Sequence, residues 1–297
     1  MLDGVMLLWF ILTGISVLFV AIDVWRTPEA TALRWGFIIL TVFSGPLGAF
    51  FYVMGCREPF PGAHERYVSP TWKQVLGSTM HCAAGDGLGI IMGAAIAFFL
   101  ASPTSVDIAI EYLLGFGFGW LFFQAFAMRD MAGGDYGKSL KMTFIPEFLS
   151  MNVLMGAMLI VAKFWMPLVP GSGDPLGPSF WFIMSISLVA GFICAFPMNW
   201  WLVTRNLKHG MMTVRHAGAG GGHAGHDMSA MTPGSEHAGH DMDNMSSEHT
   251  PATNEHAEHN MKHTPPFGVI FAMGLLSTAI LGACISIVLT LAPTSVG

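Results

Sequence analysis

The chain has 297 residues, of which 53% are hydrophobic and only 11% are charged. Soluble domains carry about 25% charged residues, so a soluble fold is excluded, because it could not hide this much apolar surface. The formal net charge is -6, and no basic patch with interleaved aromatic residues is present, which argues against nucleic acid as a partner. The four cysteines show no Cys-x-x-Cys pair or regular spacing and do not indicate a disulfide scaffold.

Seven stretches are long and apolar enough to cross a bilayer as helices, which takes about 20 residues each. The first stretch lacks the charged start and the small-residue cleavage site of a signal peptide, so we expect a retained helix. The sequence therefore predicts an all-α, polytopic transmembrane helical bundle of about seven spans. In chain order the predicted spans cover residues 5–24, 33–54, 75–100, 106–128, 144–166, 179–201 and 267–291.

These spans predict four parts. Residues 1–72 hold two N-terminal transmembrane helices and a loop, and residues 73–212 form a membrane core of four helices. Residues 213–266 form a polar loop rich in His and Met, and residues 267–297 hold the C-terminal transmembrane helix. The polar loop has almost no apolar periodicity and many Gly, Ser, Thr and Asn residues, so we expect it to be disordered when free.

Orientation follows from Lys and Arg, which favour cytoplasmic loops. With seven spans, ten of these residues fall on one side of the membrane, and three, Arg26, Arg34 and Lys163, fall on the other. This distribution predicts that the N-terminus and the polar loop are cytoplasmic and that the C-terminus is external. The first two loops conflict with each other, because both carry positive charge.

The polar loop contains a repeated motif: HAGHDMSAM at 223–231, HAGHDMDNM at 237–245 and a degenerate copy, HAEHNMKH, at 256–263. Imidazoles bind copper, zinc and nickel, whereas thioethers select copper(I) and, by extension, silver(I). We therefore expect the loop to bind a metal, with copper first and zinc, nickel or silver as alternatives. The other interpretation is a His-rich linker without a selected role. The candidate ligands are His223, His226, Met228, Met231, His237, His240, Met242, Met245, His256, His259, Met261 and His263.

Polar residues inside the predicted spans form a second group of candidates, because ionisable side chains in a membrane are costly and commonly mark a pathway or a site. Cys82 and Asp86 are four residues apart and therefore share a helix face. Most of the group falls in the predicted cytoplasmic half, where the polar loop leaves the membrane. The methionines also fit ordinary packing, and Glu147 also fits an interfacial position. The candidate intramembrane site comprises His81, Cys82, Asp86, Glu111, Glu147, Met151, Met198 and Asn199.

Four segments carry a family resemblance: STMHCAAGDGLGII, EYLLGF, FLSMNVLMGAM and FPMNWWLVTRNLKHGMM. Through these motifs, residues 73–212 resemble a bacterial family of multi-pass integral membrane proteins known only as a domain of unknown function. The resemblance implies a multi-pass protein of the bacterial inner membrane, sometimes with a His-rich extension. It implies no particular activity.

No catalytic motif, such as GxSxG, HExxH or a phosphate-binding glycine loop, occurs in a suitable context, so we do not expect an enzyme. The expected function is the handling of a soft transition metal, copper first, by transport or buffering, with the lipid bilayer and the metal ion as partners. One alternative is a membrane-embedded metallochaperone or assembly factor that serves a copper protein. Another is a transporter of a different solute, in which the loop is an accessory.

Overall fold

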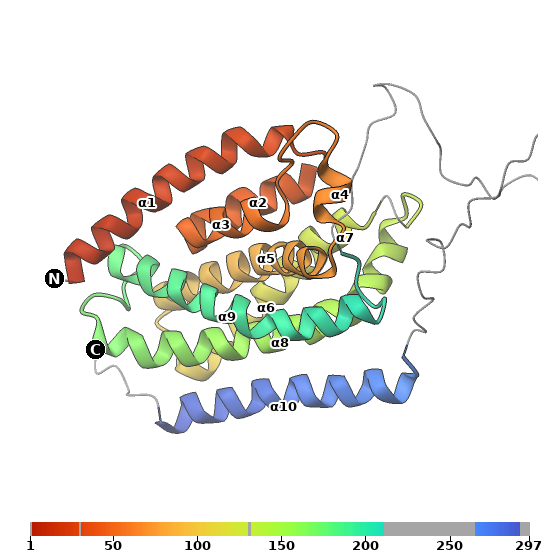
Figure 1. Ribbon diagram of the computed structural model, residues 1–297. Helices are drawn as coiled ribbons and strands as arrows, with labels where there is room; N and C mark the ends of the chain where they lie inside the picture. The colour runs from red at the N-terminus through yellow and green to blue at the C-terminus, as the bar shows by residue number, and fades with distance from the viewer. Residues whose placement is uncertain (1, 30, 130–131, 211–264, 292–297) are drawn as a thin grey trace, which may run out of the picture. The chain divides into compact units, whose positions relative to one another are not determined.

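The computed structural model describes residues 2–29, 31–129, 132–210 and 265–291 (Figure 1). Within these ranges the protein is all-α, and six helices are long and apolar enough to cross a membrane. The predicted helical membrane bundle is therefore confirmed. The metal ligands predicted between His223 and His263 lie outside the described residues.

The helices follow one another along the chain with short connections. Their bounds are α1 Leu2–Asp23, η1 Val24–Arg26, α2 Thr31–Ser44, α3 Pro46–Gly55, α4 His64–Val68, α5 Thr71–Leu100, α6 Thr104–Gly117, η2 Phe118–Gln124, α7 Ala125–Ala127, α8 Tyr136–Trp165, η3 Met166–Leu168, α9 Pro178–Thr204 and α10 Phe267–Leu291. Segments α6, η2 and α7 follow one another without a break and form one long element.

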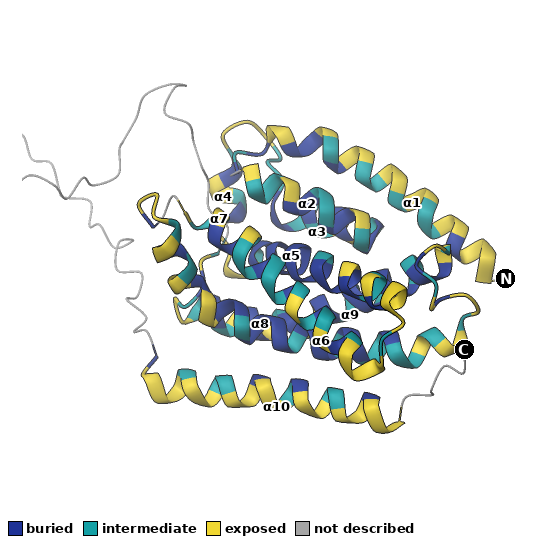
Figure 2. Ribbon diagram, turned by 180° about the vertical axis from the view of Figure 1, so that it is seen from behind, coloured by how far each residue is buried: buried dark blue, intermediate teal, exposed yellow. Residues whose placement is uncertain are grey.

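Helix α5 lies at the centre of the bundle and packs against α6, η2, α9 and α2. Glycines on α5 let the neighbouring backbone approach closely. A Cβ at Gly89 would lie 2.6 Å from the Cα of Gly115, and one at Gly93 would lie 2.7 Å from the Cα of Glu111. Figure 2 shows that the buried surface gathers around α5, α8 and α9, while α1 and α10 are mostly exposed. The outer helices therefore present apolar surface to lipid.

The predicted span at 33–54 is divided at Gly45 into two shorter helices, α2 and α3. Gly45 has a φ of +62°, a left-handed conformation that glycine adopts without steric cost. Pro46 then occupies the first turn of α3, where its missing N–H is tolerated. The rings of Phe37 and Tyr52 lie 5.5 Å apart, so α3 folds back along α2. The two helices form a hairpin.

The two ends of this hairpin meet beside the end of α1. Arg57, which follows α3, forms a two-pronged ion pair with Asp23, with N–O distances of 2.9 and 3.0 Å. The Tyr52 hydroxyl donates to the same carboxylate at 3.0 Å and lies 2.8 Å from the Thr27 hydroxyl. The hairpin therefore begins and ends at the same end of the bundle.

The six long helices, in contrast, each run from one end of the bundle to the other (Figure 1). We call the end where α9 finishes and α10 begins, at Thr204 and Phe267, the loop end. We call the opposite end, at Leu2 and Leu291, the terminal end. Both ends of the hairpin lie at the loop end, and so does the connection from α3 to α5.

Gly45→Ala should destabilise the protein. A Cβ at this position would lie 2.8 Å from Thr13 Oγ1 and from the Trp9 ring, and the left-handed backbone adds strain. We expect a loss of about 1–3 kcal/mol, measured as a lower unfolding temperature in detergent. Gly14→Ala is the matched control, because nothing lies within 4 Å of its Cβ position, and it should leave the temperature unchanged or higher. Equal effects of both substitutions would contradict the hairpin.

Candidate functional site

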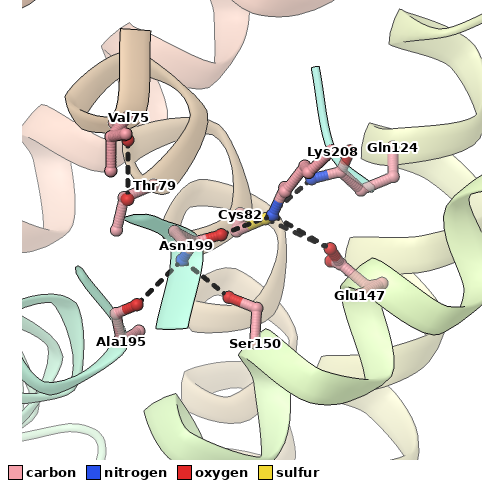
Figure 3. Close-up of polar contacts among 9 residues, drawn as sticks. All are labelled: Val75, Thr79, Cys82, Gln124, Glu147, Ser150, Ala195, Asn199 and Lys208. Carbon is pink, nitrogen blue, oxygen red and sulfur yellow. Dashed lines mark hydrogen bonds and ion pairs between the residues drawn. The ribbon is translucent and has the colours of Figure 1, made fainter. Parts of the chain in front are cut away.

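Five polar side chains converge inside the bundle toward its loop end (Figure 3). They are Cys82 of α5, Gln124 of η2, Glu147 of α8, Asn199 of α9 and Lys208, which follows α9. Each is at most 7% exposed. Lys208 belongs to the segment that leaves the membrane, but its side chain returns into the interior. We refer to these five residues as the Lys208 cluster.

The thiol of Cys82 and the ammonium of Lys208 lie at the centre of the cluster. Gln124 Nε2 donates to Cys82 Sγ at 2.7 Å, and the Lys208 ammonium donates to the same sulfur. Cys82 Sγ in turn donates to Glu147 Oε2 at 3.1 Å. Lys208 Nζ also donates to Asn199 Oδ1 at 2.8 Å and lies 3.9 Å from Glu147 Oε2. The ammonium is therefore held by a sulfur, an amide oxygen and a carboxylate.

The charge of Lys208 is maintained by its neighbours. Burial alone would lower the pKa of the ammonium, because a dry interior disfavours charge. Cys82 and Glu147 act in the opposite direction, and the pKa of Lys208 lies above its usual value. The cluster therefore holds a cationic amine at neutral pH.

A second carboxyl group, that of Asp86, lies beside Glu147. A Cβ at Gly119 would lie 2.5 Å from Glu147 Oε1 and closer still to Asp86 Oδ1, so both groups occupy the space that this glycine leaves. No N–H or O–H group of another residue donates to the oxygens of Asp86 or to Oε1 of Glu147 within the described residues, although the two carboxyl groups are close enough to interact with each other. We refer to Asp86 and Glu147 as the carboxyl pair. Carboxyl oxygens are acceptors, so the pair offers a place where a cation can bind.

The cluster is supported by a stretch of π-helix, η2, which contains both Gly119 and Gln124. The Tyr136 hydroxyl of α8 donates to the carbonyl oxygen of Leu121 at 2.6 Å and so holds this irregular backbone against α8. Segments of π-helix are rare and are frequently found at functional sites. Here the wider turn carries the glycine that faces the carboxyl pair and the amide that reaches Cys82.

The amide of Asn199 is oriented by two further contacts. Its Nδ2 donates to Ser150 Oγ at 2.8 Å and to the carbonyl oxygen of Ala195 at 3.1 Å. With the nitrogen so engaged, the amide oxygen faces the Lys208 ammonium (Figure 3). Helices α8 and α9 therefore fix the acceptor geometry before any ligand arrives.

Buried polar contacts continue away from the cluster toward the terminal end. The Tyr112 hydroxyl donates to Asn152 Oδ1 at 2.9 Å, and Asn152 Nδ2 donates to Ser277 Oγ at 3.2 Å. Closer to the terminal end, Lys163 Nζ lies 3.6 Å from Glu111 Oε1. That ion pair borders a cavity of about 380 Å³ between α5, α6, α8 and α9.

The structure brings together four of the eight residues predicted for the intramembrane site, namely Cys82, Asp86, Glu147 and Asn199. Glu147 was also compatible with an interfacial position, but it is fully buried within α8, which runs unbroken through Pro146. Local sequence spacing identified the Cys82–Asp86 face, and the fold supplied its partners.

The other four predicted residues lie elsewhere. The His81 ring lies 5.6 Å from the Phe123 ring and faces α2. Glu111 pairs with Lys163 at the terminal end. Met151 and Met198 pack in two separate apolar clusters. No group of three or more His, Cys, Asp or Glu side chains is arranged to hold a metal ion within the described ranges.

Sequence reasoning missed Gln124 and Lys208. Gln124 lies in η2, where the π-helical turn changes which residues share a face, so α-helical spacing does not place it beside Cys82. Lys208 lies past the end of α9 in a polar stretch, and nothing local predicts that its side chain turns back. The available signal was the family resemblance, which extends through both positions.

Comparison with known proteins supports that resemblance. Residues 71–208 match the family described as a domain of unknown function, DUF4396. We refer to this matched segment as the DUF4396 domain. The matched region begins at α5 and ends at Lys208, so the DUF4396 domain contains the whole Lys208 cluster and the carboxyl pair. No curated protein and no solved structure matches the chain.

Lys208→Met should destabilise the DUF4396 domain by about 3–5 kcal/mol, because it leaves a buried acidic group without its counter-charge. Adding Glu147→Gln should recover most of that loss, since the unpaired charge is then removed as well. Lys138→Met, at an exposed position of α8, is the control and should have little effect. Thermal unfolding in detergent measures all three. A Lys208→Met protein as stable as Lys138→Met would contradict the buried ion pair.

Proposed function

We propose that this protein handles a soft transition metal, with copper as the first candidate, by carrying it across a bacterial inner membrane. The observation that carries the proposal is the succession of buried polar groups inside the DUF4396 domain. It runs from the Glu111–Lys163 pair through Tyr112 and Asn152 to the carboxyl pair and the Lys208 cluster. Polar groups in a membrane interior are costly, so a line of them at successive depths favours a pathway over simple packing.

The sequence of the polar loop supports the choice of metal. Its repeated His and Met residues are ligands for copper(I), and this loop begins directly after the segment that carries Lys208. Capture by the loop and entry at the loop end of the DUF4396 domain would then be consecutive steps. Each step would be a ligand exchange, with thioether and imidazole sites weak enough to release the ion.

The carboxyl pair suits such a step chemically. A cation entering a dry interior needs a negative group to meet it, and a proton must leave when a thiol becomes a ligand. Carboxyl groups at this position can supply the charge or accept the proton. The chain shows no nucleotide-binding motif, so transport would be secondary or passive, or driven by a partner.

We further propose that the loop end faces the cytoplasm. Because the α2–α3 hairpin returns to its own side, six crossings place the N-terminus opposite the polar loop, whereas the seven-span prediction placed both on one side. Lys163 is the one Lys or Arg at the terminal end among the described residues. Those at the loop end are Arg26, Arg34, Arg57, Arg66, Lys73, Arg129, Lys138, Lys141, Arg205 and Lys208. Lys and Arg are enriched on the cytoplasmic side of membrane proteins, so this unequal distribution favours a cytoplasmic loop end.

A labelling experiment tests this orientation. In intact spheroplasts, a membrane-impermeant maleimide should label an Asp3→Cys variant above the level of the parent protein. A Glu65→Cys variant, in exposed α4 at the loop end, should be labelled only after the membrane is permeabilised. The reverse pattern, or the same behaviour of both positions, would overturn the proposed topology.

Cellular copper tests the proposed transport. Deleting the gene should change copper tolerance and copper content by about twofold or more, and the wild-type gene should restore both. Asp86→Asn should fail to restore them at equal membrane abundance, because the carboxyl pair is lost, whereas Glu65→Gln should restore them fully. Unchanged copper content and tolerance after deletion would sink the transport proposal.

A membrane-embedded metallochaperone is the second candidate, and one observation favours it. The Lys208 ammonium fills the centre of the cluster, so the described structure is closed to through passage at that depth. In that case the protein would hand the ion to a copper enzyme instead of releasing it across the membrane. Loss of a copper enzyme's activity at normal total copper would favour this function. If removing residues 218–265 leaves the activity intact, the loop is an accessory and the solute is a different one.

A further inference from the structure

The Lys208 ammonium occupies a position that is bordered by three acceptor groups. It contacts Cys82 Sγ, lies 2.8 Å from Asn199 Oδ1 and lies 3.9 Å from Glu147 Oε2. An ammonium group carries one positive charge at the end of a flexible side chain. Its binding partners are therefore those that a free cation of the same charge would meet.

The surroundings hold more acceptor capacity than Lys208 uses. Glu147 Oε1 and both oxygens of Asp86 are fully buried, and within the described residues no donor reaches them apart from the contact between the two carboxyl groups themselves. One amine thus faces a thiol and two carboxyl groups. Unpartnered buried acceptors are costly, and their concentration around one point indicates a site built for a ligand.

A cavity of about 230 Å³ opens beside this position at the loop end. Lys208 and Gln124, the two donors to Cys82, form part of its wall, together with Met128, Met142 and His209. Burial lowers the pKa of His209, so its imidazole is neutral at pH 7 and free to act as a ligand. Two thioethers and a neutral imidazole are ligands that a soft cation prefers.

The segment that carries Lys208 is short and irregular. It lies outside any helix, and Asn206 has a left-handed φ of +56°. The backbone N–H groups of Leu207 and Lys208 both donate to the carbonyl oxygen of Leu202, at 3.0 and 3.2 Å. These bonds tie the segment to the end of α9, so withdrawal of the ammonium would require this short stretch to change its conformation.

We propose that Cys82 and Asn199 bind a soft monovalent cation, that Glu147 takes up the proton of the Cys82 thiol, and that the Lys208 ammonium is the built-in, displaceable occupant of this site. The cavity lined by Met128 and His209 gives access to this site. Identification of the cation as copper(I) rests on the proposed function. The site itself rests on the geometry of the cluster.

The exchange balances in charge and in protons. The incoming cation binds Cys82 Sγ, and the thiol proton passes to Glu147 Oε2, to which the thiol already donates at 3.1 Å. The Lys208 ammonium leaves with its charge intact, and no electron is transferred. One positive charge replaces another, so the charge of the dry interior is unchanged. A divalent ion such as zinc(II) would add a charge and meet a higher desolvation cost.

Silver nitrate, a redox-stable probe for copper(I), tests the proposal on the full-length protein in chloride-free detergent solution. Excess free methionine and imidazole keep the polar loop from retaining silver. The rate at which N-ethylmaleimide alkylates each cysteine is then followed by peptide mass spectrometry, and the silver-free protein gives the reference rate for Cys82, which reacts slowly because it is buried. Silver should protect Cys82, and Lys208→Met should lower the half-protecting concentration at least tenfold. Protection of Cys194, an exposed thiol on α9, should be the same in both proteins and serves as the internal control.

Two results would contradict the proposed site. In the first, silver protects Cys194 and leaves Cys82 reactive. In the second, Lys208→Met does not change the silver concentration that gives half-maximal protection of Cys82. If the variant folds poorly, the wild-type protein alone still tests the proposal. In that protein, zinc(II) at the same concentration must leave Cys82 reactive. Equal protection by zinc(II) would refute exchange with a monovalent charge.

The silver experiment and the cellular copper experiment can fail independently of each other. Protection of Cys82 by silver, together with unchanged copper content in cells lacking the gene, would retain the site and reject transport. Altered copper content with an unprotected Cys82 would retain transport and place its path elsewhere in the bundle.

Discussion

A charged amine that is buried inside a membrane protein must meet its counter-charge there, because burial removes most of the water that would otherwise stabilise it. The arrangement of the DUF4396 domain follows from this constraint at Lys208. Helices α5, α8 and α9 each contribute one partner to the ammonium, and η2 contributes the amide that shares its sulfur. Ser150 then orients Asn199, so the requirement extends to a second layer. The last residue of the matched domain thus ties together the helices that come before it.

Much of the architecture could be predicted from the sequence, because its cause is local. A run of about 20 apolar residues forms a helix in a membrane whatever its neighbours are, and six of the seven predicted spans became single continuous helical elements. The spacing of Cys82 and Asp86 placed them on one face for the same reason. Where the cause is tertiary, the sequence alone does not supply it. The run at 33–54 has the right length for a span, and the structure shows that it is divided at Gly45 and that α3 packs back along α2.

The same distinction between local and tertiary causes applies to the candidate site. Ionisable residues inside apolar runs stand out in a sequence, and half of those singled out do meet. His81 was as conspicuous as Cys82, but it lies on the neighbouring face of α5 and turns toward α2. A shift of one position along a helix rotates a side chain by about 100°, and only the packing of α5 decides which face meets α8. Lys208 shows the opposite failure, since an ordinary basic residue after a helix became the centre of the cluster.

The hairpin has a consequence for the N-terminal helix. At Gly45 the backbone leaves its helical path opposite the middle of α1, where Trp9 and Thr13 lie directly against the turn. Irregular backbone is tolerated at membrane depth only where protein covers it. Helix α1 buries few of its own side chains, so it adds little to the core. Its role is to cover the break between α2 and α3 and so to keep acyl chains away from it. A chain without α1 would expose that break to lipid.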